Sequence, residues 1–124
     1  MKKLTYISVL FSLFFILILP SCDFLKKKHA DVVLLGEINV IVHDQWYGYI
    51  EYIGEVKNIG NATAEMVEIK FNTYNKNNEL ISVDSKAIAL FLEHGEEAGF
   101  ELHAYCDVEQ YDHYTYNIKW SEAD

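Results

Sequence analysis

The stretch GEVKNIGNATAEMVEIKFNTYNKNNELI, residues 54–81, decides the fold of this 124-residue chain. Its centre alternates apolar and polar side chains, a period that places each set on one face of a β-strand. Two segments rich in Gly and Asn, KNIGNATA and NKNNE, flank this strand with the residues that tight turns need. The stretch therefore predicts strand, turn, strand and turn in succession. The apolar positions are Val67, Ile69 and Phe71, and the polar ones are Glu68, Lys70 and Asn72.

The same alternation recurs on both sides of this stretch, from Val32 to the C-terminus. Six or seven short strands, each with one apolar face, can bury those faces only in two packed sheets. We therefore expect an all-β, immunoglobulin-like β-sandwich of about seven short strands, preceded by an N-terminal signal helix. The expected strands lie near 38–42, 50–56, 67–71, 79–83, 86–92, 100–106 and 114–120.

The N-terminus has the organisation of a secretory signal. Lys2 and Lys3 precede LTYISVLFSLFFILILPSC, an uncharged run that ends at Cys22. A basic start, an apolar centre and a small residue before the cleavage point are typical of such signals. The run is also long enough to be read as a membrane-spanning helix, and this alternative stays open.

The end of that run, LPSC at residues 19–22, resembles the lipobox of bacterial lipoproteins. Leu19 and Ser21 match it, whereas Pro20 stands where another small or polar residue is usual. The resemblance implies that the Cys22 sulfur carries a diacylglycerol and that cleavage after Ser21 makes Cys22 the new N-terminus. Two or three acyl chains would then hold the protein on a membrane of the bacterial cell envelope, inner or outer.

Three parts of the chain follow from this interpretation. Residues 1–21 are the signal peptide, residues 22–31 the lipidated N-terminus and tether, and residues 32–124 the sandwich domain. The chain has 19 acidic residues against 10 Lys and no Arg, and without residues 1–21 eight Lys remain, a formal charge of −11. Such a surface is a poor partner for phosphate backbones, so we expect no nucleic-acid binding.

Residues 45–102 also resemble the FxLYD domain, a small immunoglobulin-like module common in bacterial envelope proteins. Two positions of its naming motif differ here, because Thr73 replaces Leu and Asn75 replaces Asp. LFLEHGEEAGF, residues 90–100, is similar to its later L-x-P-G-x-x-x-x-F pattern but lacks the proline. These motifs imply the fold, and the family as a whole has no established activity. The matching residues are Gly54, Val56 and Asn58 of G-x-V-x-N, and Phe71 and Tyr74 of the naming motif.

No catalytic or metal-binding pattern stands out. By alternation Cys106 shares the face of Phe100 and Leu102, while His103 lies on the opposite face. His103, Cys106 and His113 have no recognised zinc spacing. We therefore expect a non-catalytic protein without a metal or cofactor. The alternative is an envelope metal-binding protein or enzyme that uses His103, Cys106 and His113.

Exposed tyrosines offer the clearest candidate surface. Tyr47 and Tyr49 point away from the face of Ile50 and Val56, and Tyr105 is a further exposed candidate. Tyr is favoured at recognition surfaces because it offers area and a hydroxyl at low entropic cost. We expect the module to bind or scaffold another envelope protein. A glycan or another ligand bound through these tyrosines is the alternative, and tyrosines are also common on the solvent side of ordinary sheets.

Overall fold

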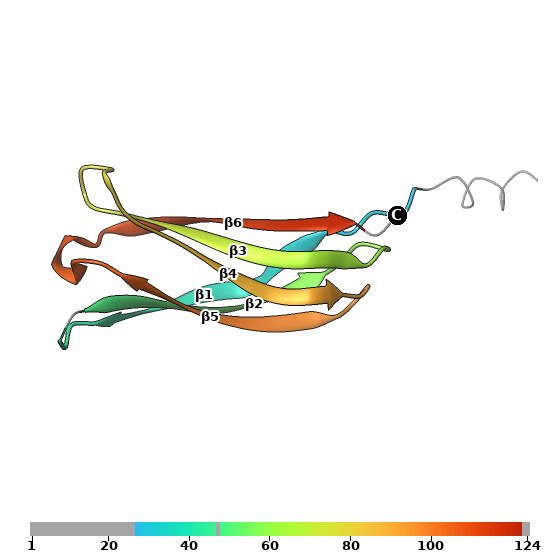
Figure 1. Cartoon of the computed structure of the whole chain (residues 1–124), viewed down its shortest axis with the longest axis horizontal. Coiled ribbons are helices and arrows are strands. Elements are labelled where there is room, and N and C mark those ends of the chain that lie inside the picture. Colours follow the sequence, from blue (N-terminus) through green and yellow to red (C-terminus); the bar gives the residue numbers. More distant parts are fainter. Residues whose placement is uncertain (1–26, 47, 123–124) are drawn as a thin grey trace, which may run out of the picture.

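Six antiparallel strands and one short 3₁₀ helix make up the computed structural model, which describes residues 27–46 and 48–122 (Figure 1). The predicted signal helix, Ser21, Cys22 and Tyr47 lie outside the described residues. Within those residues, no helix is both long and apolar enough to cross a membrane. The elements are β1 Val32–His43, β2 Tyr49–Asn58, β3 Ala64–Tyr74, β4 Leu80–Leu92, β5 Glu97–Tyr105, η1 Val108–Gln110 and β6 His113–Glu122.

The strands form two three-stranded sheets that lie face to face (Figure 1). Sheet A has the order β1-β2-β5 and sheet B the order β4-β3-β6. The chain crosses between the sheets after β2, after β4 and after β5. This order corresponds to strands A-B-E and C′-C-F of the immunoglobulin fold. The prediction of an all-β sandwich is confirmed.

The strand count differs from the prediction, because β4 is one strand of 13 residues where two were expected. It pairs with β3 from Leu80, opposite Tyr74, to Leu92, opposite Ala64. A register shift between Val67 and Glu68 interrupts the alternation along this pair. The polar residues Asp84 and Ser85, which separate the two expected strands, pair with Phe71 and Lys70 in regular register, so pairing with β3 holds β4 continuous across them.

The core lies between the inner faces of the two sheets. The rings of Tyr52 and Phe71 stack across it with centroids 4.2 Å apart, and Phe71 is buried as predicted. The Tyr52 hydroxyl shares a hydrogen bond of 2.8 Å with Thr73 Oγ1, so both buried hydroxyls have a partner. The alternation continues to the end of β3, where Thr73 is buried and Tyr74 is half-buried. Three strands supply most of the buried side chains: Ile50, Tyr52 and Val56 from β2; Val67, Ile69 and Phe71 from β3; and Phe100, Leu102 and Ala104 from β5.

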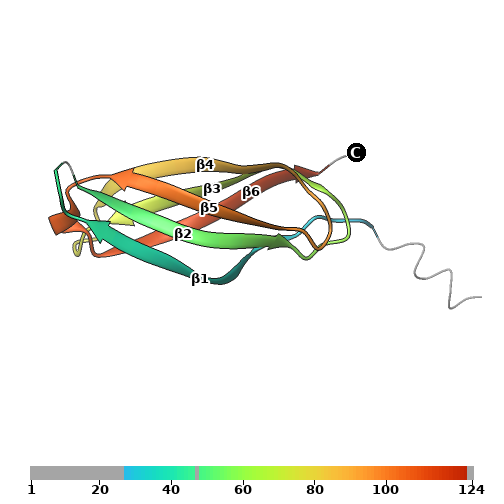
Figure 2. The ribbon, with the colours of Figure 1, turned by 90° about the horizontal axis from the view of Figure 1, so that it is seen from below.

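The sandwich has two distinct ends (Figures 1 and 2). The end where residues 29–31 and the last residues of β6 meet the turns 59–63 and 93–96 is called the entry end. The opposite end, which carries the β1–β2 turn, the β3–β4 turn and η1, is called the distal end. The strands run the length of the molecule between them, so every residue on a strand has a defined height between the two ends.

The last three residues of the predicted tether pack against the entry end. Ile59 N–H donates to Asp31 O at 2.8 Å, and Asn61 N–H donates to His29 O at 2.9 Å. Ala30 is buried, and its N–H donates to Glu122 Oε1 at 2.8 Å. The chain therefore joins the sandwich at a fixed place, beside the end of β6.

Asn58 ties the entry end together from a fully buried position. Its Oδ1 accepts from the N–H groups of Asp31 and Gly60, at 3.1 and 3.0 Å. Its Nδ2 donates to the carbonyls of Ala62 and Leu92, at 2.8 and 2.9 Å. One side chain thus joins the incoming segment, the β2–β3 turn and the end of β4, which explains why an Asn stands at the end of β2.

Gly54, the first residue of the same match, leaves room in the core for an aromatic ring. A Cβ at this position would lie 2.7 Å from Cζ of Phe100, which faces Gly54 across the β2–β5 pair. Gly54, Asn58 and Phe71 therefore all serve the fold, Asn58 through hydrogen bonds and the other two through packing.

Candidate functional site

Sheet register brings His43, Tyr49 and Tyr105 into one row at the distal end. His43 on β1 and Tyr105 on β5 both pair with Tyr49 on the central strand β2. Tyr49 is half-buried on the outer face, whereas Ile50 beside it is fully buried in the core. The prediction that Tyr49 points away from the core face is confirmed.

The rings of this row contact one another. Tyr49 stacks on His43 with centroids 4.3 Å apart, and its centroid lies 4.6 Å from that of His103 and 5.5 Å from that of Tyr105. Tyr105 is 67% exposed, so the prediction of an exposed ring is confirmed. Tyr49 therefore fixes the orientation of two imidazoles, and Tyr105 presents most of its surface to solvent.

Trp46 is the binding candidate that sequence reasoning missed. It lies in the β1–β2 turn and is 96% exposed, the most exposed large apolar side chain among the described residues. A pocket at this turn is lined by Trp46, His43 and Tyr49 together with Asp44, Gln45 and Val42. The signal was present in HDQWYG, since a Trp inside a turn has no strand to carry it into the core.

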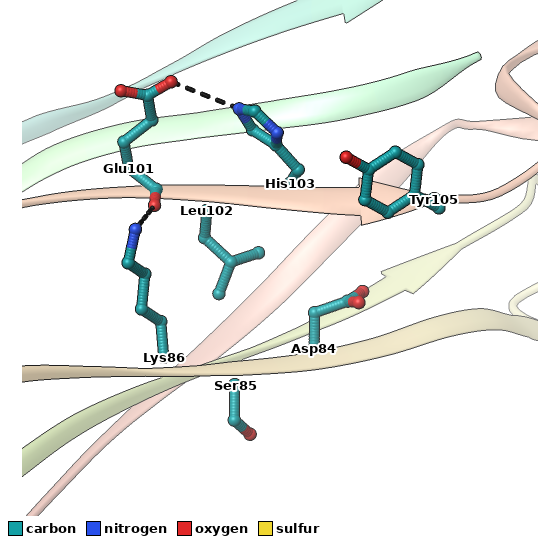
Figure 3. A pocket seen from close by; sticks show the side chains of 7 residues that line it. All are labelled: Asp84, Ser85, Lys86, Glu101, Leu102, His103 and Tyr105. Atoms are coloured by element: carbon teal, nitrogen blue, oxygen red, sulfur yellow. Dashed lines mark hydrogen bonds and ion pairs between the residues drawn. The ribbon is translucent and has the colours of Figure 1, made fainter. Parts of the chain in front are cut away.

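A charged cluster lies next to Tyr49 on the outer face of sheet A. Glu51 faces His103 directly in the β2–β5 register, and Glu51 Oε2 lies 3.0 Å from His103 Nε2. The same nitrogen lies 3.1 Å from Oε1 of Glu101. Figure 3 marks this contact with a dashed line. On the other side, His43 Nε2 lies 3.6 Å from Glu51 Oε1. Two carboxylates and two imidazoles therefore converge from three neighbouring strands.

The side chains around Glu51 lower its pKa below the ordinary value. The first cause is the side chain of Glu101, followed by the hydrogen bond with His103 and by the nearby ring of His43, while burial acts in the opposite direction. Glu51 is accordingly the ionised centre of the cluster.

The cluster borders a pocket between the edges of β4 and β5 (Figure 3). Glu101, His103 and Tyr105 extend from one side of β5, and Leu102 extends from the other side toward the sandwich interior. Lys86 of β4 reaches across and donates from Nζ to the backbone oxygen of Glu101. This lysine contacts the strand and does not pair with the Glu101 carboxylate.

The alternative set His103, Cys106 and His113 is not assembled. Cys106 is half-buried against the core, and burial, together with Asp84 and Asp107, raises the pKa of its thiol. His113 pairs with Asp112 at 2.8 Å and stacks on Tyr74. Across residues 27–46 and 48–122, the single group of His, Cys or acidic side chains close enough to share a metal ion is Glu51, Glu101 and His103.

No family model, no curated protein and no solved structure matches this chain. The function proposed below therefore depends on the residues and their geometry.

Proposed function

We propose that this chain is a lipoprotein, anchored to a bacterial envelope membrane through Cys22, whose sandwich binds or scaffolds another envelope protein with its distal end. The observation that carries the proposal is the separation of the two ends. The chain joins the sandwich at the entry end, whereas Trp46, Tyr49 and Tyr105 lie at or near the opposite end. An anchor that precedes His29 leaves the aromatic end facing away from the membrane.

Side-chain chemistry supports a protein partner for this surface. Trp46 and Tyr105 are 96% and 67% exposed, and Trp and Tyr are enriched among the residues that contribute most to protein–protein binding. The formal charge of −11 after residue 21 favours a partner with a basic rim, because complementary charge speeds association.

The sandwich is proposed to be an FxLYD-like module. Support comes from the structural roles of the matching residues: Gly54 makes room for Phe100, Asn58 joins the entry end, and Phe71 stacks in the core. These roles concern folding, so the module supplies a rigid support and the exposed distal residues supply the recognition.

The lipid anchor is tested by metabolic labelling with a fatty-acid analogue. The wild-type chain should incorporate the label and Cys22→Ser should not, because only the thiol can form the thioether. Cys106→Ser is the matched control and should be labelled like the wild type. Equal labelling of the wild type and Cys22→Ser would refute the anchor.

The binding surface is tested by a photoreactive amino acid placed in intact cells at position 46 or 105. We expect the same envelope protein to be crosslinked from both positions. The control position is Asn61, which is exposed at the entry end. If position 61 captures that protein equally well, the distal end is not the binding surface.

A small ligand is the second candidate, favoured by the pocket that Trp46 and Tyr49 line beside Asp44 and Gln45. Aromatic faces with a few polar groups nearby are typical of ligand sites. Binding to an oligosaccharide array that is lost in Trp46→Ala and in Tyr49→Ala would support it. Binding that persists in both variants would remove it.

A further inference from the structure

Three large apolar side chains are exposed where β3 starts and β4 ends, beside the entry end (Figure 1). Met66, Leu90 and Phe91 are 67%, 66% and 61% exposed. Met66 and Leu90 line one pocket together with Ile88, and Phe91 faces Glu65 in the β3–β4 register. Met66, Leu90 and Phe91 are called the apolar patch. Grouped apolar side chains on a protein surface mark contacts with a protein or a membrane.

A β-bulge in β3 turns Met66 outward. Against β6 the register of β3 shifts between Glu65 and Glu68, and such a bulge re-aims the side chains beside it. Counted in twos from the buried Ala64, strict alternation would place Met66 in the core, but the bulge places Val67 there and leaves Met66 in solvent. The Met66 φ angle is 48°, in the left-handed region that residues with a Cβ rarely adopt. The strained backbone therefore presents an apolar side chain to the outside, which core packing does not explain.

The proposed anchor keeps the apolar patch close to a lipid surface. Cys22 stands seven residues before His29, whose backbone is hydrogen-bonded to the entry end. Seven residues span at most about 25 Å when fully extended. Ala30 N–H donates to Glu122 of β6, and β3 and β4 are the next two strands of that sheet, about 10 Å further. A chain held by acyl groups at Cys22 therefore has its apolar patch within reach of the bilayer.

We propose that the apolar patch inserts into the interface of the bilayer that holds Cys22 and so orients the sandwich on the membrane. The inference rests on the anchor given under the proposed function. Apolar side chains gain free energy when they leave water for the boundary between headgroups and acyl chains, and this second contact reinforces a lipid anchor. The carboxylates of Glu65 and Glu68 flank the patch, so we expect zwitterionic rather than strongly anionic lipid beneath it.

Methyl NMR of the lipidated chain in phosphatidylcholine bicelles that contain a spin-labelled phosphatidylcholine tests the contact. Signal cleavage removes Met1, so Met66 is the single methionine of the mature chain and its methyl signal needs no variant. The Met66 and Leu90 methyl signals should lose at least about half their intensity, because inserted side chains lie about 5–10 Å into the interface. Leu80 and Val83, exposed toward the other end of β4, are the matched controls and should keep theirs. Full Met66 intensity, or equal loss at Val83, overturns the proposal.

Flotation of the same chain with phosphatidylcholine vesicles reports the anchor separately. A chain that floats while Met66 keeps its intensity retains the anchor and refutes the apolar contact. A chain that does not float refutes the anchor, and this inference with it. Leu90→Asp should float like the wild type but reduce the loss of Met66 signal at least about twofold, because a charge resists insertion. Leu80→Asp should leave both measurements unchanged, and an equal effect of the two variants would contradict the assignment to the patch.

A photoreactive amino acid at position 91 distinguishes lipid from protein in intact cells. We expect a lipid adduct, identified by mass spectrometry of the purified chain. A protein adduct without a lipid adduct would assign the patch to a protein partner and overturn the proposal.

Discussion

The two ends of the sandwich differ in the hydrogen bonding and the exposure of their side chains. At the entry end Asn58 is fully buried and makes four hydrogen bonds. At the distal end Trp46 and Tyr105 are exposed, and toward that end Nε2 of His43 is buried without a partner. A satisfied buried network specifies and stabilises a fold, whereas exposed aromatic area contributes nothing to folding. The comparison separates residues that keep the chain folded from residues available for recognition.

We expect the largest effect on stability from a substitution at the centre of the entry end. Asn58→Ala leaves two N–H groups and two carbonyls without their partner, so we expect the free energy of unfolding to fall by about 3 kcal/mol. Urea denaturation followed by tryptophan fluorescence measures the change. Asn61→Ala is the matched control: its exposed side chain accepts one hydrogen bond, from His29 N–H, and the loss should stay within about 1 kcal/mol. A similar loss in both variants would mean that burial of Asn58 is not the cause.

Gly60→Ala tests how firmly the incoming segment is held. The new Cβ would lie 2.2 Å from His29 O and 2.5 Å from Asp31 N, and backbone cannot move aside as a flexible side chain does. We expect a loss of about 2 kcal/mol and faster hydrogen exchange at Ile59 N–H, which donates to Asp31 O.

The control for Gly60→Ala is Gly99→Ala. At position 99 the nearest atom to a new Cβ is Gly54 O at 3.8 Å, an ordinary contact. Its stability should stay within about 0.5 kcal/mol of the wild type. If Gly60→Ala is equally well tolerated, residues 29–31 are not fixed as described.

Tyr52→Phe probes the core between the two ends, with a smaller effect. Burial raises the pKa of Tyr52 above its ordinary value of 10.0, although its hydrogen bond with Thr73 acts in the opposite direction. Above pH 10 the unfolded chain releases the phenol proton while the folded state retains it, so stability present below pH 10 falls as the pH rises. The fall amounts to at most about 1.4 kcal/mol per pH unit for this one proton.

At pH 7 the variant should lose about 1 kcal/mol, because Thr73 Oγ1 stays buried without its partner. Urea midpoints measured between pH 8 and pH 11 should decline less steeply in Tyr52→Phe than in the wild type. Tyr111 and Tyr114, whose pKa values are also raised, keep some decline in the variant. Parallel declines in the two proteins would contradict the assignment to Tyr52.

Local alternation was enough to predict the sandwich, because each strand carries its own period of two. Val67, Ile69 and Phe71 are all fully buried, as that period requires. The prediction of two strands at 79–83 and 86–92 was wrong, because pairing of Asp84 with Phe71 and of Ser85 with Lys70 holds β4 continuous across the polar residues between the two segments. Long-range pairing overrides local pattern at such edges.

The charged cluster could not be predicted in the same way. Glu51 and His103 are 52 residues apart and meet only through the β2–β5 register. Alternation gives the face on which each side chain lies but not its partner on the neighbouring strand. Tyr49 and Tyr105 were identified because exposure depends on the face alone, whereas a cluster that spans strands needs the register.

We expect the smallest effect on stability from substitutions of the distal aromatic residues. These variants test most directly whether the two ends differ in role. Trp46→Ala and Tyr105→Ala remove exposed side chains, so the free energy of unfolding should stay within about 0.5 kcal/mol of the wild type. In the same variants, crosslinking of the envelope partner from the other aromatic position should be lost. Asn58→Ala should show the reverse, with reduced stability and retained crosslinking in the folded fraction. A distal variant that loses more than about 1 kcal/mol would place these rings among the folding residues, and the two ends would no longer differ in role.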